Sequence, residues 1–558
     1  MNFNRRFHVA LLTVFVGAMI ARVPGQANAA GIRTVALSGQ HAPGTPDGIV
    51  FTTDLYGPLL NGDGQVAFYT PVTGPGVDST NRWGIWSEFD GALTLVARAG
   101  DQAATIPAGA TYRHLGAPAF NDGGRIAFYA SLTRPDVPIA ERLILSGTPG
   151  SLRTVARSGS QAPGMQAGVD FTGMGDPSLN SVGQTAFAAS TQPRLFTGFS
   201  SGIWSEGGGS LAMVAQQGTQ APGAPPGLVF DPFPAVSRDI NFRPPLISAT
   251  GTTAFQTRLQ SFYVDHGIWS DKTGELRLIM HNEQQVPNIA PEVYFSNMYP
   301  DTFQAGKPYL SGGGHTAFRA GLFGPGANAL TDGDIWSDRG GSVALVVRDG
   351  DPAPGMPDGT TFQGLAVRYP FHPMSVNAKG ELAFVAFLDG PSNISGMSVW
   401  SEGSGSLALV ARGGENAPGA NANDAFISFE SISLNSLGQT AFLASFRDSA
   451  IEGPIMHGIW ARDVLGQLQL IVREGDVLEV APGDFRTVNS VDFLGNSEAA
   501  SGRGAFNDRG QLAFRASFID GTNGLFVSDL VAVPEPSTLA LAATGLVVLL
   551  LSIRRRRK

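Results

Sequence analysis

One eight-residue pattern, N-x-x-G-x-x-A-F, recurs eight times along this chain and sets the register of everything between its copies. The copies occupy residues 61–68, 121–128, 180–187, 248–255, 311–318, 377–384, 435–442 and 507–514, with Ser in place of Asn at Ser248 and Ser311. Asn and Gly three residues apart favour a tight turn, because both tolerate positive φ. The Ala-Phe pair then alternates with its neighbours as in a strand with Phe on the packed face. Consecutive copies start 58 to 72 residues apart, which leaves room for a four-stranded sheet in each unit.

Three further elements complete the unit. A strand marked by Gly-Ile-Trp-Ser, or a variant of it, contains six of the seven tryptophans, which we interpret as core residues. A third strand ends in arginine in five units, at Arg98, Arg157, Arg348, Arg412 and Arg473. A Gly-x-x-Ala-Pro-Gly stretch follows, and its proline lacks the N–H that a ladder needs, so it predicts a crossing between sheets. A fourth strand, around Phe51 or Phe171 for example, leads back to the next Asn.

The two ends of the repeat region complement each other. Residues 34–44 resemble a third strand and its crossing with no unit before them, whereas the last unit stops at residues 526–530 without that strand. β-Propellers close in this way, with the first strand completing the last sheet so that no long edge stays open. We therefore predict an all-β fold, an eight-bladed β-propeller over residues 30–530 closed by its N-terminal strand. An open β-solenoid is the alternative, but it leaves the complementary ends unexplained.

Residues 1–29 have the three parts of a secretory signal peptide: Arg5 and Arg6, an apolar run over 9–20, and a small-x-small site at 27–29. The chain contains no cysteine, which excludes disulfides, thiolate metal sites and a cysteine nucleophile. Between this leader and the C-terminal tail lie 29 of the 37 basic residues and 45 of the 46 acidic ones. Such an acidic body, without a basic cluster, is not typical of proteins that bind nucleic acid.

The last residues, 531–558, have three parts. Pro534, Glu535 and Pro536 precede an apolar run over 539–553, and Arg554, Arg555, Arg556 and Arg557 lie at its end before Lys558. This arrangement resembles the PEP-CTERM sorting signal of Gram-negative bacteria. The run of 15 residues spans about 22 Å as a helix, less than the roughly 30 Å hydrocarbon core. It predicts a transmembrane helix that anchors the chain temporarily, with an ordinary permanent anchor as the alternative.

The resemblance implies processing by an exosortase. It also implies an inner-membrane intermediate, held through the C-terminal helix, and then delivery to the cell surface or an exopolysaccharide matrix. The repeats are similar to those of a second group, the tandem-repeat NxxGxxAF proteins with a variable choice of anchor, for which no activity is implied.

Residues that carry chemistry are sparse in this sequence. The eight histidines show no metal-site spacing, and Gly198 to Gly202 matches G-x-S-x-G without a following helix, so we interpret it as a turn. Asp-rich turns at residues 332–334 and 349–351 leave Ca²⁺ open, although neither completes an EF-hand loop. We assign no catalytic, cofactor-binding or metal residue. The irregular stretches 232–245 and 281–308 are the expected place for any ligand site, since only they depart from the repeat.

Two hypotheses for function remain. The first is a non-catalytic surface or matrix propeller that binds polysaccharide or a surface protein. The alternative is a hydrolase or lyase that acts on matrix glycans on the same scaffold. A central funnel lined by repeat-equivalent residues favours binding, whereas a cluster of non-equivalent Asp, Glu, Arg, His or Tyr favours an enzyme.

Overall fold

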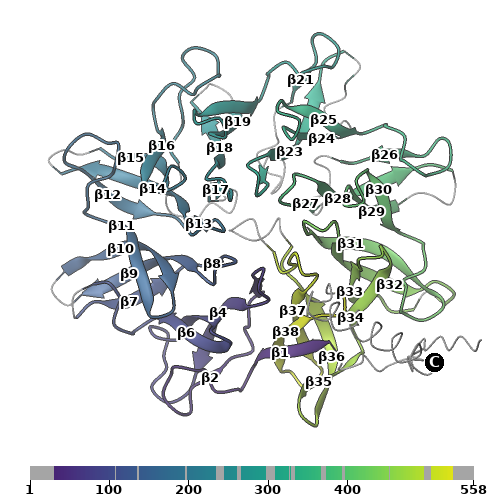
Figure 1. Cartoon of the computed structure of the whole chain (residues 1–558), viewed down its shortest axis with the longest axis horizontal. Helices are drawn as coiled ribbons and strands as arrows, with labels where there is room; N and C mark the ends of the chain where they lie inside the picture. Colours follow the sequence, from purple (N-terminus) through teal and green to yellow (C-terminus); the bar gives the residue numbers. More distant parts are fainter. Residues whose placement is uncertain are drawn as a thin grey trace, which may run out of the picture.

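The computed structural model describes residues 31–531, except 107–108, 135–136, 195–197, 234–243, 261–264, 297–307, 326, 328–332, 366–372, 392–395, 452 and 496–503. Over these residues, eight antiparallel sheets are arranged as blades around one axis, which confirms the predicted eight-bladed β-propeller (Figure 1). The described part of the chain contains strands and no helix, and thus no helix able to cross a membrane. The predicted signal peptide and the transmembrane helix over 539–553 lie outside the described residues.

Each blade uses the sequence units in one order from the axis outward. The Ala-Phe strands lie second from the axis: β4 (Val66–Thr73), β9 (Ile126–Arg134), β14 (Thr185–Pro193), β18 (Thr253–Leu259), β23 (Thr316–Phe323), β28 (Leu382–Asp389), β32 (Thr440–Asp448) and β37 (Leu512–Phe518). The Gly-Ile-Trp-Ser strands and their variants lie third: β5 (Trp83–Phe89), β10 (Val137–Thr148), β15 (Ser200–Ser205), β19 (Asp265–Ser270), β24 (Gly333–Ser337), β29 (Gly396–Ser401), β33 (Met456–Arg462) and β38 (Asn523–Ser528). The outermost are β6 (Ala92–Arg98), β11 (Ser151–Arg157), β16 (Ala212–Gln216), β20 (Arg277–His281), β25 (Ala344–Arg348), β30 (Ala408–Arg412), β34 (Leu468–Arg473) and β1 (Ile32–Leu37).

The strand nearest the axis differs from the prediction, because most blades divide it into two short segments. The pairs are β2 (Val50–Phe51) with β3 (Leu59–Leu60), β7 (Thr111–Leu115) with β8 (Ala119–Phe120), β12 (Val169–Met174) with β13 (Ser178–Leu179), β21 (Tyr294–Phe295) with β22 (Tyr309–Leu310) and β26 (Thr361–Gln363) with β27 (Met374–Val376). Blade four contributes β17 (Leu246–Ile247), blade seven the continuous β31 (Asp424–Leu434), and blade eight β36 (Asp484–Asp492) with β35 (Val477–Ala481) at its edge.

Proline explains the division of the inner strand. A proline immediately precedes the second inner segment in blades one, two, three, five and six, and the single inner segment β17 in blade four. These prolines are Pro58, Pro118, Pro177, Pro308 and Pro373, and Pro245 in blade four. Because proline cannot donate to a ladder, the pairing with the neighbouring strand stops there. Blade seven has no proline between residues 424 and 434, and its inner strand β31 runs unbroken along β32 with local bulges.

The ring closes as the complementary ends predict. β1 pairs antiparallel with β38, with Ile32 opposite Ser528 and Leu37 opposite Gly524, and so becomes the outer strand of blade eight (Figure 1). Arg33 also forms an ion pair with Glu88 of blade one at 2.6 Å. The open β-solenoid is therefore excluded.

The core lies between blades. The six tryptophans of the third strands are fully buried, which confirms their interpretation as core residues. Phe442 and Trp460 of blade seven, for example, pack in one cluster with Val385 and Val399 of blade six. Several indoles also donate to the proline carbonyl of the Ala-Pro-Gly crossing, as Trp204 does to Pro163 at 2.9 Å. A crossing proline thus stops a ladder and accepts a hydrogen bond from the buried tryptophan of its neighbouring blade.

Candidate functional site

The N-x-x-G turns meet at the axis, and their asparagines fold them locally. In the first copy, Asn61 Oδ1 accepts the backbone N–H groups of Asp63 at 3.1 Å and Gln65 at 2.8 Å. Gly64, at φ 81°, supplies the left-handed residue that this turn needs. The asparagine side chain therefore supplies the acceptor that these two N–H groups of the turn would otherwise lack.

The other half of each amide joins neighbouring blades. Asn435 Nδ2 donates to the carbonyl of Asn507 at 2.9 Å, and Asn507 Nδ2 donates to the carbonyl of Asn61 at 2.9 Å, across the closure of the ring. The same kind of bond runs from Asn61, Asn121, Asn180 and Asn377 to the turn of the following blade. Ser248 and Ser311 keep only the local bond, to Thr252 N at 3.1 Å and His315 N at 2.9 Å. Their hydroxyls are too short for the longer reach, so this chain of amides is interrupted at blades four and five.

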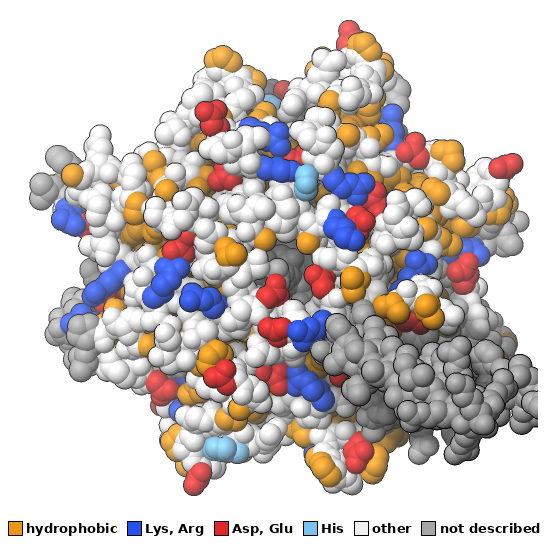
Figure 2. Space-filling view, in the orientation of Figure 1, with side chains coloured by type: hydrophobic (Ala, Val, Ile, Leu, Met, Phe, Trp, Pro, Cys, Tyr) orange, Lys and Arg blue, Asp and Glu red, His pale blue; other side chains and the backbone are white. Residues whose placement is uncertain are grey.

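These turns surround a cavity of about 140 Å³ to which all eight blades contribute. Figure 2 shows the hollow at the centre of the ring, with acidic side chains on its rim. The acidic residues that line the cavity, Asp122 and Asp508, occupy the same position of the repeat, and each accepts a backbone N–H from the preceding blade: Gly62 at 2.8 Å and Ser436 at 2.6 Å. The cavity is therefore lined by repeat-equivalent groups, and their polar atoms already hold the ring together.

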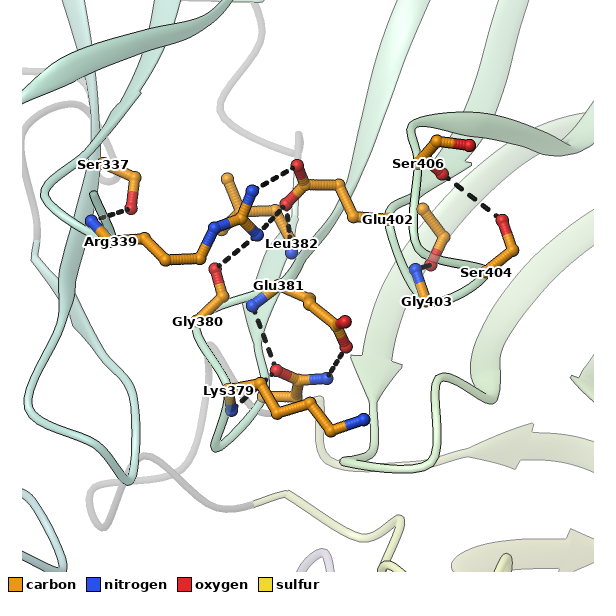
Figure 3. Close-up of polar contacts among 12 residues, drawn as sticks. Ser337, Arg339, Lys379, Gly380, Glu381, Leu382, Glu402, Gly403, Ser404 and Ser406 are labelled. Carbon is orange, nitrogen blue, oxygen red and sulfur yellow. Dashed lines mark hydrogen bonds and ion pairs between the residues drawn. The ribbon is translucent and has the colours of Figure 1, made fainter.

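A second set of contacts between blades involves the acid that follows Trp-Ser. Glu402 accepts the N–H of Leu382 in its own blade at 2.9 Å and pairs with Arg339 of the preceding blade at 2.8 Å (Figure 3). The same arrangement joins Arg33 to Glu88, Arg153 to Glu206 and Arg277 to Asp338. These acids were missed in the sequence interpretation, although their recurrence after Trp-Ser was readable.

Two of the recurrent arginines at the ends of the outer strands pair within their own blade. Arg157 pairs with Glu141, and Arg473 pairs with Asp424 at 3.4 Å. Ion pairs between blades come instead from Arg33, Arg153 and Arg277.

Three aromatic residues of blade one lie near a carboxylate of blade three. We call Tyr56, Tyr69, Trp83 and Asp176 the aromatic cluster. Tyr69 stacks on Trp83 with ring centroids 4.7 Å apart, and Tyr56 lies 5.8 Å from Trp83. Burial raises the pKa of the Tyr69 phenol, and the nearby Tyr56 and then Asp176 raise it further. Sequence periodicity could not reveal this cluster, because Tyr56, Tyr69 and Trp83 occupy different positions of one repeat and Asp176 belongs to another.

Asp176 supplies the one carboxyl of this cluster. Burial raises its pKa from 3.8 to about 6, and among the described residues no donor or cation offsets that burial. Its carboxylate lies against Gly116, where an added methyl group would overlap it. A carboxyl that is held in place, poorly solvated and unpaired is the kind of group found at functional sites.

We expect Asp176→Asn to stabilise the protein in a pH-dependent way. The folded pKa exceeds the unfolded one, so protonated Asp176 favours folding, and this contribution is lost as the pH rises through about 6. The variant should gain about 1–3 kcal/mol in the free energy of unfolding at pH 8 and little at pH 4. Urea denaturation at both pH values measures this, with the exposed Asp47→Asn as control. Equal destabilisation at both pH values would contradict the assignment.

The other positions singled out in the sequence have structural roles or lie outside the described residues. Asp349 accepts the N–H groups of Gly333 and Leu365 at 2.9 Å each, and Asp351 accepts that of Arg348. Over the described residues, no group of three His, Asp or Glu side chains converges as a metal site. The sorting-signal residues and much of 232–245 and 281–308 are not among the described residues.

Three solved structures illustrate what the fold is similar to. The oligogalacturonate lyase from Vibrio parahaemolyticus is 12% identical, with 79% of this chain and 98% of that chain covered and a TM-score of 0.33. The Dos1 propeller is 9% identical over 86% and 95%, with a TM-score of 0.34. A polysaccharide lyase described as an ulvan lyase is 10% identical over 89% and 95%, with a TM-score of 0.29. Similarity at this level carries no argument about activity, and no curated protein matches the chain.

Two family patterns match the sequence itself. The PEP-CTERM protein-sorting motif matches residues 532–557 and implies an exported protein of a Gram-negative bacterium that is processed by an exosortase. The second pattern matches in overlapping segments, residues 26–142, 108–295, 235–369 and 288–540, and by this match the chain belongs to the Family of unknown function (DUF7453).

Proposed function

We propose that this protein is a non-catalytic propeller of the cell surface or exopolysaccharide matrix, which binds polysaccharide or a surface protein there. The observation that carries the proposal is the central cavity, because repeat-equivalent turns of all eight blades line it. Its asparagines and aspartates already bond to the neighbouring blade, as Asn435 does to Asn507. Polar groups engaged in this way are suited to holding a rigid ring and not to moving protons.

The ends of the chain support the same proposal. A signal peptide over residues 1–29 and a transmembrane helix over 539–553 would carry the body across the inner membrane and hold it there until the exosortase acts. The repeats favour a place for this protein among the tandem-repeat NxxGxxAF proteins with a variable choice of anchor. The acidic body, with 45 acidic and 29 basic residues, would stay soluble beside an anionic surface without adhering to nucleic acid.

Binding and hydrolysis measured together test this proposal. The purified body, residues 30–530, should bind exopolysaccharide from the producing cell in a sedimentation assay and release no reducing or unsaturated ends from it. Absence of binding to both the polysaccharide and the cell surface would contradict the proposal.

A glycan-acting hydrolase or lyase is the second candidate, and the raised pKa of Asp176 beside Tyr69 favours it. Product formation that Asp176→Asn abolishes would establish this alternative in place of binding alone.

We expect replacement of Pro534, Glu535 and Pro536 by alanine to leave the full-length protein in the inner membrane. The unaltered protein should appear outside the cell, shorter by about the mass of the tail, because the motif at 532–557 directs exosortase processing. Immunoblots of fractionated cells measure both. Replacement of Ser537 and Thr538 by alanine serves as a control that leaves Pro534, Glu535 and Pro536 unchanged. Unaltered protein found intact in the inner membrane of cells with an exosortase would reduce the tail to a plain anchor.

A further inference from the structure

Exposed aromatic rings gather in one place on blade one. Tyr56 is 49% exposed, and its ring is inclined by 33° to that of Trp83. Six of the seven tryptophans are fully buried, whereas Trp83 is only half-buried. Tyr69 supports Trp83 from one side at an interplanar angle of 14°, and the Arg82 guanidinium lies 5.4 Å from the centre of the Trp83 ring. These contacts hold Trp83 rigidly, so that Tyr56 and Trp83 form an accessible apolar platform that costs little ordering on binding.

Hydrogen-bonding groups border this platform. Within the described part of the chain, the Tyr69 hydroxyl and the Asp176 carboxylate make no hydrogen bond, and both residues are half-buried. Asp176 lies between β12 and β13 of blade three, Tyr69 lies on β4 of blade one, and blade two supplies Gly116 as the seat of the carboxylate. Half-buried polar groups without protein partners can still accept or donate a hydrogen bond, so a ligand that bonded to both would gain affinity from each.

The chemistry of the platform and of its border selects one ligand class. The C–H faces of a pyranose ring pack on aromatic rings, and its hydroxyls donate to carboxylates and accept from phenols. A uronate or sulfated sugar would bring a negative charge next to Asp176 on an already acidic body. We propose that the aromatic cluster is a binding site for a neutral sugar unit of a polysaccharide. This inference rests on the proposed binding function and gives it a location.

Trp83 provides the readout. Since the other six tryptophans are fully buried, a ligand on the platform should change the fluorescence of Trp83 alone. The intact body is titrated with dextran and with a neutral galactan, and with polygalacturonate as the charged comparison. Tyr56→Ala should weaken binding of a neutral polysaccharide about tenfold or more, as expected for an aromatic anchor, and Asp176→Asn should weaken it without unfolding the protein. Phe485→Ala, which removes a ring 62% exposed on blade eight, is the matched control and should bind as the unaltered body does.

The outcomes separate the location from the function. If the unaltered body binds a neutral polysaccharide and Tyr56→Ala binds it equally well, the site is elsewhere and the proposed function stands. Binding of polygalacturonate in preference to both neutral polymers overturns the neutral-sugar assignment. If the unaltered body binds none of the polymers and also fails to sediment with the native exopolysaccharide, polysaccharide binding fails together with the site. Trp83→Phe should abolish the fluorescence change but leave sedimentation intact, and loss of sedimentation on Phe485→Ala would show that the platform has no special role.

Discussion

Deleting residues 30–39 should destabilise the entire ring in one cooperative step. These residues include β1, whose Ala36 is fully buried and whose Thr34 donates to the carbonyl of Val480 at 2.8 Å. Without β1 the edge of β38 opens, and blade eight loses its outer strand together with the Arg33 to Glu88 contact with blade one. The loss should be comparable with the whole stability of a domain, about 5–15 kcal/mol. Thermal melting of the body followed by circular dichroism measures it.

The matched control keeps the strand and removes only the Arg33 side-chain contacts with blade one, which are the ion pair with Glu88 and a hydrogen bond to the Gly64 carbonyl. Arg33→Ala should lower the free energy of unfolding by about 1 kcal/mol or less, since this arginine is 39% exposed. A deletion variant that melts like the unaltered body would show that ring closure does not stabilise the fold.

Phe442→Ala should lower the free energy of unfolding by about 3–5 kcal/mol. Phe442 is fully buried between blades six and seven, with its ring stacked on Trp460 at 6.3 Å and edge-on to Phe429 at 5.4 Å. Truncation leaves a cavity that these rings cannot collapse to fill. Chemical denaturation compares it with the exposed Phe485→Ala, which should change stability by less than about 0.5 kcal/mol. A loss below about 1 kcal/mol at Phe442 would show that this position is not part of the core.

Repetition made the fold readable from sequence. Eight copies of one pattern fixed the number of blades, and the unmatched strand at residues 34–38 predicted its pairing with β38. Burial of Trp86 and its equivalents followed from their replacement by Leu and Phe in two units. Such inferences succeed because equivalent residues of all units lie in the same environment. A replacement in one unit therefore shows which side chains that environment accepts in every unit.

Contacts that join repeats were not readable in the same way. The bond from Asn435 to Asn507 depends on how closely two turns approach at the axis, which is a property of the ring and not of either turn. The candidate site was harder still, since Asp176 of blade three comes near Tyr69 of blade one only after the blades have packed. The expectation that a ligand site would follow irregular sequence pointed to residues 232–245 and 281–308, much of which lies outside the described residues.

The pairing of β1 with β38 also makes closure of the ring depend on synthesis of the whole propeller. Ile32 is among the first residues of the body to be synthesised, and its partner Ser528 lies 496 positions later. Blades one to seven contain their own strands and can form in order, but blade eight must wait for its last strand to appear. By then the other blades have brought both ends together. The entropy cost of closing so long a loop is therefore divided among the short loops that close within each blade. A chain truncated before residue 523 lacks β38, so the edge of β1 stays unpaired and exposed to aggregation or proteolysis. Only a body that extends through β38 can close the ring.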